Sequence, residues 1–364
     1  MKPTWRWWNC QLSAPAAKSR RNWVEGPGFR TELNLKGVIR AFRNSGVTLV
    51  HRLNLRDYYG VLLRICRNRS RLVDRHYPAP SSVSMGQPRH HSVKIIEQCS
   101  ISPPPDSVPP TSIPLTFFDL PWFYLHPIQR IFFYELPQPT TTNQILQTVV
   151  PTLKHPLSLT LQHFFPFAGN ILVPLHPGNF PHILYSDGDS VSFTVAESHE
   201  DFNYFVANAP THLRDLNLLA PVFPSPLTTQ DGGKLLPLMA VQITVLPNYG
   251  FSMCVGFNHV VADGRAFHHF IKFWASVCRT RGEDMESVKE SLQLPLHNRD
   301  AIEDWRGLKL VFLEELSSSF TKIVKSFGIL VDIPSNKVRF TFTLSREQVE
   351  KIKKWIYLEC KKRD

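Results

Sequence analysis

Residues 238–278, LMAVQITVLPNYGFSMCVGFNHVVADGRAFHHFIKFWASVC, decide the fold of this chain. Two apolar segments, 238–246 and 251–258, flank the turn residues PNYG and predict a β-hairpin. After Gly264, apolar residues recur three, four and seven positions apart, which predicts a helix with one buried face. That face consists of Phe267, Phe270, Ile271, Trp274, Val277 and Cys278. A strand that leads into such a helix predicts a layered α/β fold, with the helix packed on a sheet.

His259 stands where the second strand of this hairpin ends, and this placement makes it a candidate general base. Histidine has the ordinary pKa best suited to removing a proton near neutral pH. Asp263 follows four residues later and is expected to cap the next helix, holding the loop that positions His259. Gly264 is expected to give room at a crowded helix start. Because the spacing HxxxDG also arises by chance, a turn histidine bonded to its neighbours is the alternative interpretation of His259.

The basic charge of the chain is confined to its first quarter. Residues 1–90 contain 17 Lys or Arg and 4 Asp or Glu, a net charge of +13. The remaining residues contain 24 and 26, a net charge of −2. The body of the protein therefore has no basic field suited to phosphate, and we expect no nucleic-acid partner.

The cysteines and the hydropathy of the chain predict a soluble cytoplasmic protein with no membrane partner. The six cysteines are scattered, without a CxxC or zinc-knuckle spacing, as is typical of reduced intracellular thiols. No apolar run reaches the roughly 18–20 residues that span a bilayer. No metal site is expected either. Asp187-Gly-Asp189 predicts a tight turn and not a calcium loop, and the adjacent His268 and His269 point in different directions on a helix.

The remaining segments predict alternating strands and helices. Strands are expected at 93–99, 130–134, 185 with 191–195 around a tight turn, and 337–343. Helices are expected at 143–154, capped by Thr142, and at 159–165, capped by Ser158. A further helix follows Ser345 and Gln348, which form a capping pair. Residues 101–114 are expected to be a loop rich in proline and serine.

Residues 1–84 differ from the rest of the chain, being rich in Arg, broken by Gly and Pro, and without a regular period. Regular patterning begins just after Met85, which would serve as a start codon. We interpret residues 1–84 as a basic, disordered extension outside the fold, arising from the gene model or read-through. A targeting peptide is the alternative, because acidic residues are few.

Several segments, taken in order, resemble the plant BAHD acyltransferases, and within them the branch that acylates anthocyanins and phenolic glucosides, often with malonyl groups. The resemblance covers about residues 91–364. The segments that carry it are VKIIE at 93–97, SPPP at 102–105, PLTFFDLPW at 114–122, LSLTLQHFFPFAGN at 157–170, YSDGDS at 185–190 and NHVVADGRAFHHFI at 258–271.

This resemblance implies an α/β, chloramphenicol-acetyltransferase-like lobe at residues 85–335, with a mixed sheet flanked by helices. It implies that His259 is the catalytic base, that Asp263 is structural beside it, and that Asp119 and Trp122 border the acceptor pocket. The reaction it implies moves an acyl group, malonyl or hydroxycinnamoyl, from acyl-CoA to a sugar hydroxyl of a phenolic glycoside. Acyl-CoA is then a co-substrate, no other cofactor is needed, and the complete enzyme is a monomer.

The sequence also departs from the family that it resembles, because it does not contain DFGWG, the second motif of that family. By this resemblance, residues 336–364 are the beginning of a second, similar lobe. The alternative to an active enzyme is therefore an inactive lobe that binds an aromatic ligand or a partner, or a non-functional gene product. A nucleic-acid-binding protein that uses residues 1–84 is the third interpretation.

Overall fold

A computed structural model describes residues 92–175, 179–207, 211–317, 324, 327, 338–339 and 344–361 of the 364-residue chain. The described residues form two five-stranded sheets, and the one with the longer strands has the order β1-β6-β10-β11-β3. These are β1 (Lys94–Ile101), β3 (Ile128–Glu135), β6 (Val191–Glu197), β10 (Met239–Leu246) and β11 (Gly250–Phe257). The sheet is mixed, because β6 and β10 are parallel and the other pairs are antiparallel. The expected hairpin is confirmed as β10 and β11.

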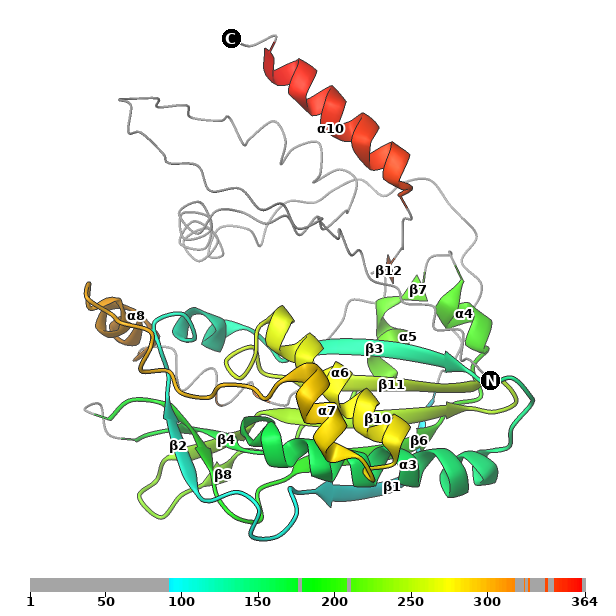
Figure 1. Cartoon of the computed structure of the whole chain (residues 1–364), viewed down its shortest axis with the longest axis horizontal. Coiled ribbons are helices and arrows are strands. Elements are labelled where there is room, and N and C mark those ends of the chain that lie inside the picture. The colour runs from blue at the N-terminus through cyan, green and yellow to red at the C-terminus, as the bar shows by residue number, and fades with distance from the viewer. Residues whose placement is uncertain are drawn as a thin grey trace. The chain divides into compact units, whose positions relative to one another are not determined.

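Helices α3 (Thr142–His163) and α6 (Gly264–Thr280) lie over one face of this sheet (Figure 1). The expected apolar face of α6 is confirmed, since five of its six residues are buried in the core shared with the sheet. The indole of Trp274 also donates a hydrogen bond to the carbonyl of Leu153 in α3, at 3.1 Å. Burying each such side chain contributes roughly 1.5–3 kcal/mol. The shorter α7 (Met285–Leu292) follows α6.

A second sheet of short antiparallel strands has the order β2-β5-β4-β9-β8. Its strands are β2 (Thr111–Pro114), β4 (Asn170–Val173), β5 (His182–Tyr185), β8 (Leu227–Thr228) and β9 (Lys234–Pro237). Its apolar core also contains Leu120 and Phe123 of the 3₁₀ helix η2 (Leu120–Tyr124), together with Val260. The core of this sheet therefore reaches the turn that follows β11.

The remaining elements connect or flank the two sheets. The short helices are η3 (Phe165–Phe167), α4 (Phe202–Val206), α5 (Leu213–Leu218) and α8 (Leu308–Ser317). A two-stranded pair joins β7 (Thr211–His212) to β12 (Val338–Arg339). Within the described residues, no helix combines the length and the apolar character needed to cross a bilayer.

The expectation of two helices between residues 143 and 165 is wrong, because α3 runs unbroken through Pro151 and Pro156. Pro156 is buried, and the carbonyl of Pro156 accepts a hydrogen bond from the Thr160 hydroxyl at 2.7 Å. The hydroxyl of Ser158, the expected cap, donates instead to the Ser102 carbonyl at 2.7 Å. Packing against the sheet and α6 thus outweighs the cost of proline in a helix.

Other boundaries moved by a few residues. The N-cap of α3 is Thr141, one residue before the expected Thr142. Part of the expected loop at 101–114 forms β2. The capping pair before α10 (Arg346–Lys361) is confirmed, because the Ser345 hydroxyl accepts from the Gln348 amide at 3.2 Å and the Gln348 side chain accepts from the Ser345 amide at 2.7 Å. The expected extension at 1–84 and the expected boundary at 335 lie outside the described residues.

Candidate functional site

The end of β11 sets His259 in a rigid turn. Asn258 is buried, and its backbone amide donates a hydrogen bond to the Leu238 carbonyl at 2.9 Å. The Asn258 side chain accepts a hydrogen bond from the Val260 amide at 3.0 Å, which closes the turn around His259. Val260 itself is buried in the core of the second sheet. Both flanks of His259 are thus fixed to the folded body, as expected from a histidine at a strand end.

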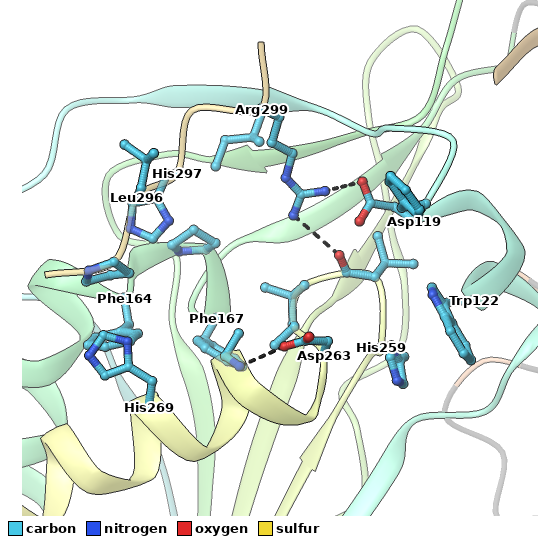
Figure 2. A pocket seen from close by; sticks show the side chains of 18 of the residues that line it. Asp119, Trp122, Phe164, Phe167, His259, Asp263, His269, Leu296, His297 and Arg299 are labelled. Carbon is cyan, nitrogen blue, oxygen red and sulfur yellow. Dashed lines mark hydrogen bonds and ion pairs between the residues drawn. The ribbon is translucent and has the colours of Figure 1, made fainter. Parts of the chain in front are cut away.

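The His259 ring lies in a partly dry environment beside an indole. It stacks on Trp122, with ring centroids 4.0 Å apart and an angle of 15° between planes (Figure 2). Its Nδ1 atom is buried and, among the described residues, has no hydrogen-bond partner. Burial lowers the pKa of His259, although the Asp263 carboxylate opposes this shift. The imidazole is therefore held neutral, the form that can accept a proton.

Asp263 faces the helix and not the His259 ring. Its carboxylate accepts a hydrogen bond from the Ala266 amide at 2.7 Å and so caps α6 (Figure 2). This is the capping position expected from the sequence. Gly264 is exposed, and a Cβ added there would meet no described atom within 4 Å other than those of its chain neighbours and of its own helix backbone. The described residues therefore do not crowd the helix start, contrary to the expectation for this glycine.

Asp119 links two loops that are far apart in the sequence. Its carboxylate accepts hydrogen bonds from the amide and the hydroxyl of Thr116, each at 2.7 Å. It also forms an ion pair with Arg299, and both side chains are less than one-fifth exposed. Arg299 in turn donates a long hydrogen bond of 3.5 Å to the Val260 carbonyl. Figure 2 shows both Arg299 interactions as dashed lines, one to Asp119 and one to the turn that carries His259.

One cavity of about 460 Å³ is lined by His259, Asp263, Asp119, Trp122 and Arg299 together with residues near them. We call the continuous segment His259–His269 the turn wall, and the two segments Phe118–Trp122 and Pro295–Ile302 together the loop wall. The turn wall contributes His259, Asp263 and His269, and the loop wall contributes Asp119, Trp122 and Arg299. Phe164 and Phe167 also line the cavity. All four residues expected near the site, His259, Asp263, Asp119 and Trp122, are therefore brought together.

Three polar residues of this cavity, His269, His297 and Arg299, were not predicted from the sequence. The prediction for the adjacent histidines went no further than excluding a shared metal, yet His269 lines the cavity and its Nε2 donates to the carbonyls of Leu292 at 2.9 Å and Gln293 at 3.1 Å. His297 donates to the His163 carbonyl at 2.9 Å, and burial lowers the pKa of His297. Arg299 was the third. His297 and Arg299 stand in the irregular segment 293–306, where no periodic pattern marks them.

Within the described residues, no three His, Cys, Asp or Glu side chains are grouped so that they could hold a metal ion. Asp189 closes the expected tight turn by accepting from the Ser186 amide at 2.8 Å. Burial raises the pKa of Cys278 to about 12, so this thiol stays protonated near neutral pH.

Comparison with known proteins gives consistent matches. A family model described as the Transferase family matches residues 91–304. The chain is 41% identical over 266 residues to coumaroyl-CoA:anthocyanidin 3-O-glucoside-6''-O-coumaroyltransferase 1 of Arabidopsis thaliana, covering 72% of this chain and 55% of that protein. It is 38% identical over 265 residues to malonyl-coenzyme:anthocyanin 5-O-glucoside-6'''-O-malonyltransferase of Salvia splendens, covering 71% and 54%. The chain thus spans about half the length of these relatives.

Among solved structures, the chain is similar to vinorine synthase. The TM-score is 0.41 and the sequence identity 22%, with 58% of this chain and 46% of that chain covered.

Proposed function

Because the chain belongs to the BAHD transferase family, we propose that the protein is an acyl-CoA-dependent O-acyltransferase. Its donor is a malonyl or hydroxycinnamoyl thioester of CoA, and its acceptor is a sugar hydroxyl of an anthocyanin or phenolic glycoside. The observation that carries the proposal is the position of His259, held in a rigid turn on the wall of a cavity with aromatic side chains, where burial lowers the pKa of its ring. A cytoplasmic location and a monomeric state are part of the same proposal.

In the proposed reaction His259 removes the proton of the acceptor hydroxyl. The oxygen then attacks the thioester carbonyl carbon, and the carbonyl electrons move onto its oxygen. When this tetrahedral oxyanion collapses, the carbon–sulfur bond breaks and the CoA thiolate leaves. The thiolate recovers the proton from His259, so that the free thiol and the new ester are the products. No covalent enzyme intermediate is needed, and a positioned base of this kind contributes about 10²–10⁴-fold.

The other site residues have supporting roles in this proposal. Asp263 caps α6 and so holds the turn in place, instead of relaying charge to His259. Trp122 and Asp119 border the acceptor, and the indole offers a flat apolar face to a phenolic ring. The aromatic residues of the cavity suit the planar part of such an acceptor, while the sugar hydroxyl is directed to His259.

The test is a direct assay of glycoside acylation with coumaroyl-CoA and with malonyl-CoA. It uses the 364-residue chain and a fusion that appends the part of the Arabidopsis coumaroyltransferase that this chain does not match. We expect a new ester in the fusion with at least one donor, and little transfer by the chain alone. A folded fusion that transfers neither acyl group to any glycoside tested would contradict the proposal.

A further inference from the structure

The Asp119–Arg299 ion pair joins the two loops of the loop wall to each other and to the turn wall. One guanidinium nitrogen pairs with the Asp119 carboxylate, and another contacts the Val260 carbonyl, next to His259. Asp119 immediately precedes η2, which carries Trp122. His259 and Trp122, whose rings stack, therefore stand on two segments that Arg299 connects without touching either ring in a described contact.

Apolar packing holds η2 to the body of the protein, but it does not by itself set the angle between the Trp122 and His259 rings. Leu120 and Phe123 anchor η2 in the same core cluster as Val260, so the 3₁₀ helix is held to the body without the ion pair. Such packing is not directional and leaves the relative angle of two rings free to adjust. The ion pair is directional and little exposed, since the Arg299 side chain is 18% exposed and that of Asp119 is 17% exposed. Breaking a partly buried pair also leaves one uncompensated charge beside the cavity.

We infer that Arg299 is a positioning residue, which with Asp119 fixes Trp122 against His259 and so sets the environment of the proposed base. The inference rests on the role of His259 proposed above, but its test requires no turnover. Trp122 stacks on the His259 ring, and the charged groups close enough to shift its pKa are Asp119 before η2, Arg130 on β3 and Asp263 at the start of α6. The Asp119–Arg299 bridge is thus one of several charged groups near His259. Its effect on the position of the Trp122 ring can be separated from the effect of its charges on the pKa of His259.

The experiment records the His259 ring by NMR in the full chain with isotope-labelled histidine, assigned by its loss in His259→Gln. A stacked indole displaces the ring proton signals, and Trp122→Leu gives the reference position without the stack. We expect Arg299→Gln and Asp119→Asn both to move the His259 signals toward that reference and both to raise the pKa of His259, because the ring becomes more hydrated. Arg299→Lys, which keeps the charge, should retain part of the wild-type position.

The two bridge variants distinguish positioning from simple charge. If Asp119 and Arg299 acted on His259 only as charges, Asp119→Asn would lower the pKa of His259 while Arg299→Gln raised it. Opposite shifts, with the ring proton signals unchanged, would overturn the inference. The control is Lys154→Gln, which breaks the ion pair between α3 and Glu97 on β1, also between distant segments. It should lower stability without moving the His259 signals, and equal movement in this control would also contradict the inference. Failure of acyl transfer in the fusion would instead concern the proposed function.

Discussion

The turn wall of the cavity is continuous in sequence, whereas the loop wall is assembled from two segments about 180 residues apart. The turn wall is fixed by local structure: a buried strand, the Asn258 side-chain bond to the Val260 amide, and the Asp263 cap of α6, each within a few residues of the turn. The loop wall depends on side chains, chiefly the Asp119–Arg299 ion pair. The turn wall therefore holds the proposed base, His259, on a rigid scaffold. The residues of the loop wall can be replaced to suit another substrate at less cost to the fold.

The largest expected effect is the loss of the proposed base from the turn wall. In the fusion, His259→Ala should lower acyl transfer about 10²–10⁴-fold, because the acceptor hydroxyl then keeps its proton. The thermal stability should fall only modestly, because the variant loses the stack on Trp122 but no hydrogen bond from Nδ1 to a described residue. Initial rates with the preferred acyl-CoA give the measurement. Retention of more than a tenth of the activity would show that another group acts as base.

The next effect tests whether the turn wall depends on the core beneath it. Phe270 is fully buried under α6, between the helix and the sheet. Phe270→Ala should lower the free energy of unfolding by about 3–5 kcal/mol, as truncation of a buried aromatic usually does. Chemical denaturation of the full chain measures it. The matched control is Phe118→Ala in the loop wall, whose side chain is 38% exposed, and it should cost far less. Phe270 directly follows the turn wall on α6, so similar losses would mean that the core supporting the turn wall is no more tightly packed than the loop wall.

The sequence predicted the turn wall better than the loop wall, because the turn wall is determined by residues that are neighbours in sequence. The hairpin is marked by apolar strands around PNYG, and Asn248 adopts the left-handed φ of 68° that asparagine tolerates. The apolar face of α6 and the Asp263 cap are likewise local patterns, so His259 was placed correctly. Arg299 and His297 lie in an irregular segment, and their partners are distant in sequence. Neither periodicity nor composition encodes such pairs, and Asp119 and Trp122 were found through the family resemblance.

Proline and glycine show the same limit in the scaffold. Pro156 predicted a helix break, but its buried position in α3 is decided by the sheet and by α6, which the local sequence does not reveal. Gly264 predicted crowding, although a Cβ there would meet no described atom within 4 Å other than those of its chain neighbours and of its own helix backbone. In both cases a residue with a strong local preference was interpreted without its three-dimensional neighbours. Tertiary context therefore decided the outcome at both positions.

A smaller effect is expected from the cap that joins the turn to α6. Asp263→Ala removes the acceptor of the Ala266 amide and should lower the free energy of unfolding by about 0.5–2 kcal/mol. Asp263→Asn keeps a capping side chain and should retain most of that stability. Thermal unfolding of the two variants compares them directly. If both lost the same large amount, the charge of Asp263, and not its cap, would be the stabilising feature.

The smallest effect concerns pH and separates the walls by their histidines. Burial lowers the pKa of both His259 in the turn wall and His297 in the loop wall. Each is therefore harder to protonate in the fold than in the unfolded chain, where the ordinary pKa is about 6.5. The unfolded chain binds more protons as the pH falls below that value, so the stability present at neutral pH is lost progressively in acid.

His297→Gln isolates the contribution of the loop wall to this acid sensitivity. Glutamine can still donate to the His163 carbonyl, as His297 Nε2 does at 2.9 Å, but it does not titrate. The fall in Tm between about pH 7.5 and about pH 5.5 should therefore be smaller in His297→Gln than in the wild type, by roughly 1–3 °C for a chain of this size. His199→Gln, at a side chain 83% exposed, controls for the loss of a histidine as such. An unchanged fall in Tm would mean that His297 is as easily protonated in the fold as outside it, and that the loop wall is open to water at this point.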